Sequence, residues 1–546
     1  MSLPMMIKIL TLFIIPIFVI SCAQRSRDKA PLGVLSYDVL KYDLALDVDI
    51  EKKNISGHNV IKFLPLVPVN AIRIDLNRAY SIDSILYDEK SLNFRRKEDH
   101  AIVLFEKPLH KKKKEELTVF YSGGFVEAEN PPWGKGGFVV SEDSSGNPWI
   151  ATTSQGSGAG CWWPAKFGKD DEPDEGMDIA ITVPSSLVAV SNGHSEGRNI
   201  LNNNKTQWKW RVQYPINSDC VTLNIADYTH FGGEEEGVEV DYYILKENED
   251  KAKKHFKEQV PKFFRAFEHY FGSYPFAKDG YKIVETPFLG MEHQSAIAYG
   301  NGYKNGYMGK DLTNSGMGLD FDFIIVHESA HEWFGNSITA KTLNDFWIQE
   351  GFTTYSESLY LRYFYGEEQS IKYINSFKNM VKNKQPIVQK REKNLLNNYD
   401  NDVYFKTALM LNTIRSVIDN DEIWWKALKD FTETYKYRIV NKNTVVNFFD
   451  SRCRIDLRPI FDQYLMFPTI PTLQLKGIKH DKVMYRWRGV IPRFEMPFEY
   501  TYEGGKNSIR RVATTKWNVI KNLSLEDINI DESRFYMNVE KKFHRE

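Results

Sequence analysis

Hydrophobic and polar residues alternate along the first part of the chain. From Tyr37 to about Gly233 the alternation has a period of two, as in residues 42–48, and Asn, Gly and Pro interrupt it. Such alternation places every second side chain on the same face of a strand. This region is therefore predicted to form antiparallel β structure.

The pattern changes after about Val238. A strand-like run at 240–244 precedes apolar residues with helical spacing, first at 254–270, and alternation returns after residue 468, as in 482–487. The chain is therefore predicted to be a multidomain α+β protein with an N-terminal antiparallel β domain at 34–235, a central α/β domain at 236–468 and a small C-terminal β-sandwich at 469–546.

Two later helices are predicted from apolar residues that recur every three or four positions. The first spans 321–335 and ends at a typical stop, Gly335-Asn336. Its expected packing face consists of Phe323, Val326, Ala330 and Trp333. The second begins near Asp345, and its expected packing face consists of Ile348, Phe352, Tyr355 and Leu359. Each helix leaves polar side chains on another face.

Length and charge narrow the class of protein. A chain of 546 residues is too long for one core and indicates several domains. Lys plus Arg number 71 against 72 Asp plus Glu, a formal charge of -1. Neither nucleic-acid binding nor electrostatic adhesion to a membrane is expected from this balance.

The N-terminus has the features of an export signal. Lys8 precedes an apolar stretch at 9–20, which is shorter than the ~20 residues that span a bilayer. Residues 19–22, Val-Ile-Ser-Cys, resemble a bacterial lipobox. We therefore expect a signal peptide at 1–21, a lipid anchor on Cys22, a tether at 22–33, and an exported lipoprotein on the periplasmic or cell-surface side of a membrane. The alternative is a cleaved secretory peptide with an incidental cysteine.

Three residues at metal-ligand spacing carry the chemistry. His327 and His331 lie four apart, on one face of a helix, and Glu350 follows after eighteen residues. Two imidazoles and a carboxylate leave one position of a tetrahedral zinc open, as in catalytic sites. One zinc ion per chain is therefore expected, with Glu328 beside it as the base that takes a proton from water. Glu357 is a candidate partner for a ligand imidazole N–H, although an ordinary surface glutamate is the alternative.

These residues resemble the M1 aminopeptidase family of gluzincin metallopeptidases, in a short bacterial form. The flanking sequences 331–336 and 347–352, together with Cys161-Trp162-Trp163-Pro164, are similar to that family, and the resemblance covers most of residues 35–475. It implies a saddle-like N-terminal β-sandwich and a thermolysin-like zinc catalytic domain. It also implies aminopeptidase activity on peptides with a free N-terminus.

The resemblance also assigns substrate-binding residues. Leu289-Gly290-Met291-Glu292-His293 stands where the family usually has Gly-x-Met-Glu-Asn, so Leu289 and His293 depart from the motif. Gly290 and Met291 are expected to line the substrate, and Glu292 to receive its ammonium group, because a buried cation needs a fixed carboxylate. Gln155 is aligned with a residue that helps to bind the amine, with a polar loop residue as the alternative.

Tyr404 is the expected donor to the oxyanion. Residues 403–406 resemble the family element Tyr-x-Lys-Gly, with Thr407 in place of the glycine. A phenol near a helix N-terminus lies in a positive field that suits a forming anion. The predicted function is therefore a zinc aminopeptidase. The alternatives are a zinc endopeptidase or amide hydrolase, and a membrane-anchored binding protein with an inactive zinc site. The sequence makes no prediction of oligomeric state.

Overall fold

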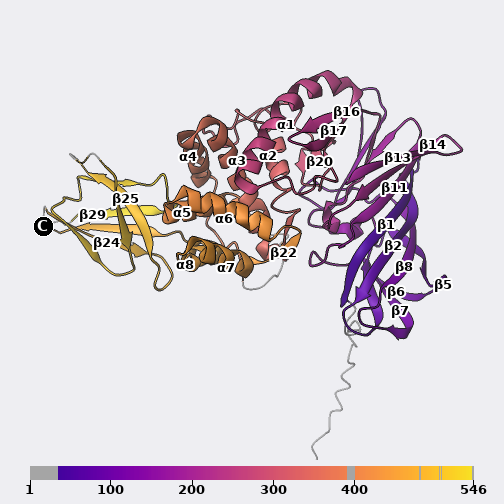
Figure 1. Cartoon of the computed structure of the whole chain (residues 1–546), viewed down its shortest axis with the longest axis horizontal. Coiled ribbons are helices and arrows are strands. Elements are labelled where there is room, and N and C mark those ends of the chain that lie inside the picture. The colour runs from indigo at the N-terminus through magenta and orange to yellow at the C-terminus, as the bar shows by residue number, and fades with distance from the viewer. Residues whose placement is uncertain (1–34, 390–399, 479–480, 503–504, 506, 544–546) are drawn as a thin grey trace, which may run out of the picture.

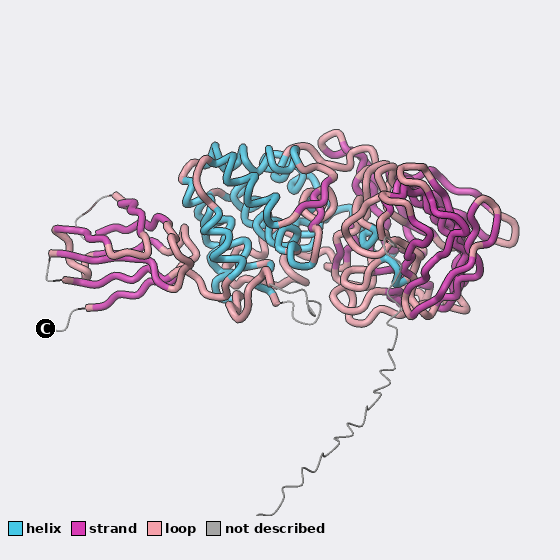
Figure 2. The backbone as a smooth tube through the Cα atoms, turned by 90° about the horizontal axis from the view of Figure 1, so that it is seen from below, coloured by secondary structure: helices cyan, strands magenta, loops and turns pink. Residues whose placement is uncertain are grey.

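The computed structural model describes residues 35–389, 400–478, 481–502, 505 and 507–543. It is elongated, with strand-rich regions at both ends and helices between them (Figures 1 and 2). The predicted signal peptide and the anchor on Cys22 lie outside the described residues. Within these residues, no helix has the length and apolar character needed to cross a bilayer. The predicted α+β class is confirmed.

The N-terminal region is built on an eight-stranded sheet. In spatial order its strands are β13 (His194–Ile200), β14 (Lys205–Val212), β11 (Met177–Pro184), β1 (Tyr37–Asp49), β2 (Asn54–Pro65), β8 (Glu115–Gly124), β4 (Tyr80–Tyr87) and β5 (Lys90–Ser91). Buried and partly exposed residues alternate along β1, which explains the period of two in the sequence. β1 and β11 pair in parallel, whereas the other pairs of this sheet are antiparallel.

Two smaller sheets complete the N-terminal region. One contains β12 (Val188–Val190), β15 (Asn224–Ala226), β10 (Pro148–Thr153) and β9 (Gly137–Glu142), and the other contains β3 (Val69–Asp75), β7 (His100–Leu109) and β6 (Asn93–Lys97). A single apolar core, which includes Trp162, Trp163 and Trp210, joins the three sheets. The loop after β10 carries Gln155 toward the central region.

The central region begins with a five-stranded sheet. Its order is β16 (Tyr228–Glu235), β17 (Val238–Leu245), β18 (Tyr281–Glu285), β20 (Ile297–Tyr299) and β19 (Gly290–Met291). Because β16 pairs with β17 along its whole length, this sheet starts at Tyr228, ahead of the boundary predicted at residue 235. The edge strand β19 carries the motif around Glu292 to the cleft.

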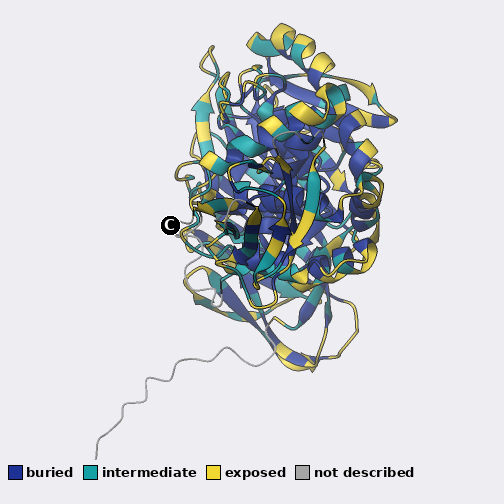
Figure 3. Ribbon diagram, turned by 90° about the vertical axis from the view of Figure 1, so that its left-hand side faces the viewer, coloured by how far each residue is buried: buried dark blue, intermediate teal, exposed yellow. Residues whose placement is uncertain are grey.

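Helices form the rest of the central region. They are α1 (Glu249–Phe271), α2 (Phe323–Ala330), α3 (Trp347–Tyr365), α4 (Glu367–Ser376), α5 (Phe405–Ile418), α6 (Asp421–Thr434), α7 (Lys442–Cys453) and α8 (Arg458–Met466), with the short strands β21 (Ile338–Ala340) and β22 (Arg438–Val440). The single-turn helices of the described chain are η1 (Ala159–Cys161), η2 (Ser218–Cys220), η3 (Lys246–Asn248), η4 (Leu343–Asp345), η5 (Phe377–Asn379) and η7 (Asn401–Val403). Residues 347–361 of α3 are all buried, so this helix runs through the middle of the domain. Figure 3 shows that buried residues gather at the centre of the molecule and exposed residues at its periphery.

The C-terminal region is a small β-sandwich. One sheet contains β27 (Asn518–Lys521), β24 (Lys482–Arg488), β23 (Thr472–Gly477) and β29 (Asn538–Lys542), and the other contains β26 (Ile509–Ala513), β25 (Met496–Tyr502) and β28 (Ile528–Asp531). Its core is continuous with that of the helices. The sandwich is therefore packed onto the central region, on the side of α5.

Candidate active site

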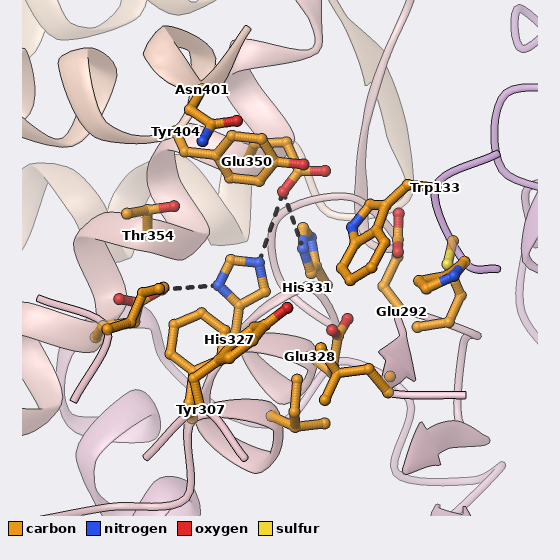
Figure 4. Close-up of a pocket in the computed structure, with 18 of the residues that line it drawn as sticks. Trp133, Glu292, Tyr307, His327, Glu328, His331, Glu350, Thr354, Asn401 and Tyr404 are labelled. Atoms are coloured by element: carbon orange, nitrogen blue, oxygen red, sulfur yellow. Dashed lines mark hydrogen bonds and ion pairs between the residues drawn. The ribbon is translucent and has the colours of Figure 1, made fainter. Parts of the chain in front are cut away.

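A cavity of ≈ 400 Å³ lies where the N-terminal region meets the central region. Its walls come from the loops around Trp133 and Gln155, from β19, and from helices α2, α3 and α5 (Figure 4). The cavity contains most of the predicted site residues, which are Gln155, Gly290, Met291, Glu292, His327, Glu328, His331, Glu350, Glu357 and Tyr404.

Helix α2 is shorter than predicted. It spans Phe323–Ala330, and His331 forms its C-cap, whereas the apolar spacing predicted a helix over 321–335. Its N-cap is Asp322, whose carboxylate accepts the backbone N–H groups of Ile324 and Ile325. The chain turns after His331, whose carbonyl accepts the N–H of Asn336. His331 nevertheless keeps helical backbone angles, so both imidazoles still face the same side.

The three predicted metal ligands converge. Glu350 Oε2 lies 3.6 Å from His327 Nε2 and 3.4 Å from His331 Nε2. A tetrahedral zinc with bonds of about 2.0–2.1 Å places its ligand atoms about 3.3–3.4 Å apart. Burial opposes ionisation of Glu350, but the charges of His331 and His327 outweigh it and lower the pKa of Glu350 to about 2. Buried Oε2 has no hydrogen-bond partner. These side chains therefore fit a zinc ion.

Each imidazole is oriented by a hydrogen bond at Nδ1, the ring nitrogen that faces away from Glu350. His327 Nδ1 lies 2.8 Å from Glu357 Oε1, and the hydroxyl of Tyr373 donates to Glu357 Oε2 at 2.6 Å. His331 Nδ1 lies 2.9 Å from the carbonyl oxygen of Phe334. Such partners fix the ring and its tautomer, leaving Nε2 for a metal. Glu357 thus occupies the position predicted for it.

The sequence prediction for Phe323 was wrong. Phe323 is only partly buried and lines the cavity, where its ring stacks on that of His327 with centroids 5.2 Å apart and an interplanar angle of 16°. Residues four apart share a helix face, so Phe323 lies on the histidine side. Tyr307 packs edge-on against it. One wall beside the metal ligands is therefore aromatic.

Glu328 points into the cavity from the next position of α2 (Figure 4). Its side chain is buried, and burial raises the pKa of its carboxyl to about 7. An oxygen of Glu328, an oxygen of Glu292 and a nitrogen of His331 all lie within 4.8 Å of one another. A carboxylate is therefore placed beside the metal ligands without being one of the three.

Glu292 is held beside Glu328 and His331. Its Oε1 accepts a 2.8 Å hydrogen bond from Gln155 Nε2, and its backbone carbonyl accepts one of 3.0 Å from Asn336 Nδ2. Burial raises the pKa of Glu292. The two residues predicted to bind an amine are thus in direct contact, although they are far apart in the sequence.

The two departures from the motif around Glu292 have different surroundings. Leu289 lines the cavity, whereas His293 is fully buried and neither ring nitrogen has a hydrogen-bond partner. Burial lowers the pKa of His293 to about 3, so the ring is neutral. At Gly290, a Cβ atom would lie 2.7 Å from Ile324 Cγ2 and 3.1 Å from Glu328 Oε1. Glycine is required there because the strand lies against α2.

Tyr404 forms the N-cap of α5 and lines the cavity above Glu350 (Figure 4). Its ring centroid is 6.3 Å from that of His327. Thr407, which replaces the expected glycine, faces Gly351 of α3, where a Cβ atom would come within 2.1 Å of Thr407 Cγ2. The added side chain is therefore accommodated because the facing helix has none at this point.

Sequence reasoning missed several residues of the site. Trp133 and Leu312 line the cavity from loops, and Thr353 Oγ1 lies 3.2 Å from His331 Nδ1. Tyr373 supports Glu357 from the neighbouring helix α4. Only Thr353 could have been found from the sequence, because it lies three residues after Glu350 and so on the same face of the predicted helix.

A histidine pair on one helix, completed by a glutamate from the next, is the arrangement of a metallopeptidase. Residues 256–464 match the model described as the peptidase family M1 domain. The chain carries a domain of that family.

Curated relatives with aminopeptidase names are similar to this chain. Aminopeptidase Q of Acinonyx jubatus is 24% identical over 302 residues, which cover 51% of this chain and 30% of the relative. Endoplasmic reticulum aminopeptidase 2 of Bos taurus is 26% identical over 302 residues, 52% of this chain and 31% of the relative. The chain thus matches about a third of the length of these relatives.

Solved structures share the fold. The M1 zinc metallopeptidase from Deinococcus radiodurans superposes with a TM-score of 0.66 at 18% identity, covering 80% of this chain and 95% of that one. A variant of the same protein bound to a Tyr-Ser-Ala substrate gives the same TM-score, identity and coverage.

Proposed function

We propose that this protein is a zinc aminopeptidase that removes N-terminal residues from peptides. The observation that carries the proposal is the short distance between the predicted ammonium site and the metal ligands. Glu292, at the predicted ammonium site, has an oxygen within 4.8 Å of a nitrogen of the metal ligand His331. One residue spans about 3.8 Å between successive Cα atoms. A substrate amine at Glu292 therefore leaves room for only one residue before the scissile carbonyl.

His327, His331 and Glu350 would hold one zinc ion, which when bound acts as a Lewis acid toward water and the scissile carbonyl. Glu328 accepts the proton of the attacking water and passes it to the leaving amine. The phenol of Tyr404 donates a hydrogen bond to the oxyanion, at the start of a helix whose dipole favours negative charge. Phe323 and Glu357 hold His327 between them.

Glu292 makes the enzyme select a free N-terminus. Its carboxylate, held by Gln155, pairs with the substrate ammonium, and the pair offsets the cost of burying each charge. An acetylated N-terminus has no charge for Glu292 to bind. This is why an exopeptidase is favoured over the endopeptidase or general amide hydrolase that the metal ligands alone would allow.

An aminoacyl-amidocoumarin panel tests the proposal. The wild-type protein is expected to cleave free aminoacyl substrates, to lose that activity with a chelator and to regain it with zinc. Glu328→Gln is expected to keep one zinc per chain and to lose about 10²–10⁴-fold in kcat. Cleavage of N-acetylated substrates at comparable rates would instead indicate an amide hydrolase or endopeptidase. A protein that binds zinc but cleaves nothing would be an inactive binding protein.

We also propose that the chain is an exported lipoprotein anchored through Cys22. The support is the sequence, in which Lys8, the apolar stretch 9–20 and the cysteine have the order of a lipoprotein signal. Expression of wild type and Cys22→Ala in a bacterial host with labelled fatty acid tests this. Label and membrane fractionation are expected for the wild type alone, and unlabelled wild-type protein would contradict the proposal.

A further inference from the structure

Apart from the two histidines of the metal site, the charged side chains on the cavity walls are all acidic. Among the described residues that line it, four are glutamates and none is Lys or Arg; the glutamates are Glu292, Glu328, Glu350 and Glu357. Lys169, whose charge acts on Glu292, does not line the cavity and forms a 2.9 Å ion pair with Asp219. Away from the metal site, an acidic substrate side chain would therefore meet like charges and no Lys or Arg.

The cavity also has an exposed aromatic side chain, Trp133. Trp133 is 64% exposed, although a tryptophan ring gains free energy by being covered. In the view of Figure 4 its indole is drawn next to Glu292 and His331, with the rings of Tyr307 and Tyr404 on other sides of the cavity. The indole thus lines the same cavity as the predicted ammonium site and the metal ligands.

A tight turn holds the backbone of Trp133. The N–H of Gly134 donates to the carbonyl of Asn130 at 2.9 Å, and Lys135 Nζ pairs with Glu129 Oε1 at 2.7 Å. A Cβ atom on Gly134 would lie 1.6 Å from the carbonyl oxygen of Glu129, so the turn is too tight for any other residue. A tight turn limits the backbone freedom of Trp133, which lowers the entropic cost of covering a ligand with its indole.

We propose that Trp133 determines the specificity of the site for the first residue of the substrate, favouring large apolar or aromatic N-terminal side chains and excluding Asp and Glu. The inference rests on the proposed aminopeptidase function. With the amine on Glu292 and the carbonyl at the metal ligands, the Cα of the first residue lies between the two. Its side chain leaves from that point, where the indole provides an apolar surface and the glutamates repel a carboxylate.

The test compares Trp133→Ala and Trp133→Phe with wild type on Phe-, Leu-, Ala- and Glu-amidocoumarin. Wild type is expected to prefer Phe and Leu, with Glu at least about 100-fold poorer in kcat/KM. The ratio of kcat/KM for Phe over Ala is expected to fall about ten-fold or more in Trp133→Ala, equivalent to about 1.4 kcal/mol, and to be largely kept in Trp133→Phe. Phe543→Ala, which removes an exposed aromatic in the C-terminal region, is the control.

The outcomes separate the two proposals. An unchanged Phe/Ala ratio in Trp133→Ala, or wild-type cleavage of the Glu substrate as fast as the Leu substrate, overturns the specificity while leaving the aminopeptidase intact. Wild-type protein that carries zinc and cleaves none of the substrates overturns both.

Discussion

At the scale of single residues, the cavity is lined by buried carboxylates, which are suited to bind cations. Glu292 and Glu328 have raised pKa values because burial disfavours their charged forms. Glu350 remains a carboxylate because two imidazoles face it. A metal ion and a substrate ammonium are the two cations that this arrangement fits. Tyr404 is the one phenol placed at both the cavity and a helix N-terminus among the described residues.

Tyr404→Phe isolates the contribution of that phenol. The variant keeps the ring and removes the donor to the oxyanion, so kcat is expected to fall about 10²–10³-fold with little change in KM or zinc content. Steady-state kinetics with metal analysis measures this. Tyr363→Phe, on the exposed side of α3, is the matched control. A Tyr404→Phe enzyme with wild-type kcat would remove Tyr404 from the proposed chemistry.

At the scale of elements, α2 depends on its N-cap. With eight residues, it is too short to be stable alone. Besides its two capping bonds, the Asp322 carboxylate accepts hydrogen bonds from Tyr299 OH at 2.7 Å, His255 Nε2 at 2.8 Å and Asn301 Nδ2 at 2.9 Å. One buried side chain thus ties the metal-binding helix to the central sheet and to α1.

Asp322→Ala is expected to lower the free energy of unfolding by about 3 kcal/mol, because the cap is lost and buried donors are left unpaired. Chemical denaturation measures the change, and a competing chelator is expected to remove zinc faster from the variant. Asp320→Ala removes a more exposed acid just before the helix and serves as the control. Equal stability of the two variants would contradict the prediction.

The sequence predicted which helices and strands form better than it predicted where they begin and end. The pairing of His327 and His331 follows from helix geometry alone, and the addition of Glu350 from a second helix followed from the interval of eighteen residues that is typical of the family. The end of α2 could not be predicted, because the turn after His331 is held by long-range contacts such as Asn336 Nδ2 to the carbonyl of Glu292. Phe323 was misplaced because a helix pattern does not show which apolar residue faces a cavity.

Trp133 and Tyr373 show a second limit of sequence reasoning. Trp133 reaches the cavity from a loop of the N-terminal region, and Tyr373 reaches Glu357 from α4. Neither contact follows from local spacing, because each depends on how separate elements pack. The assignment of both Gln155 and Glu292 to the substrate amine came from family resemblance, and their hydrogen bond has no local signal in the sequence.

At the scale of the whole molecule, the C-terminal sandwich is connected to Tyr404. The hydroxyl of Tyr536 accepts a 2.8 Å hydrogen bond from Asn383 Nδ2, and the backbone N–H of Asn383 donates to Asp402 Oδ2 at 2.7 Å. Asp402 belongs to η7, directly before Tyr404. The backbone N–H of Tyr536 also donates to Thr413 of α5. The sandwich therefore supports the start of the helix that carries the phenol.

Tyr536→Phe removes one hydroxyl from this chain of contacts. The hydrogen bond contributes about 0.5–1.5 kcal/mol, so kcat is expected to fall about two- to ten-fold while KM is retained. Tyr500→Phe changes another buried tyrosine of the sandwich and controls for a general loss of stability. Equal kcat in Tyr536→Phe and Tyr500→Phe would show that the hydrogen bonds of Tyr536 do not affect the position of Tyr404.

The N-terminal and central regions are joined by a buried acid, and this predicts a pH dependence. Glu172 accepts a 2.6 Å hydrogen bond from Thr339 Oγ1 of β21, and burial raises its pKa from 4.5 to about 7, with Asp171 raising it further and Lys169 lowering it. Between these two values the folded state binds more protons than the unfolded state. Stability is therefore lost as pH rises from 4.5 to 7.

Glu172→Gln cannot ionise and can still accept from Thr339. Relative to wild type, it is expected to gain up to about 3 kcal/mol of stability as pH rises across this window, and the difference is expected to be constant above it. Unfolding in denaturant at several pH values measures the difference between the two proteins. A difference that does not vary with pH would contradict the prediction.

The close approach of Gly351 and Thr407 sets how tightly two helices of the site pack against each other. Since a Cβ at Gly351 would lie only 2.1 Å from Thr407 Cγ2, α3 and α5 touch with no slack at this point. Gly351 directly follows Glu350, and Thr407 lies three residues after Tyr404. The same contact between α3 and α5 therefore sets the separation of the carboxylate and the phenol, and a larger side chain at position 351 would force these two helices apart.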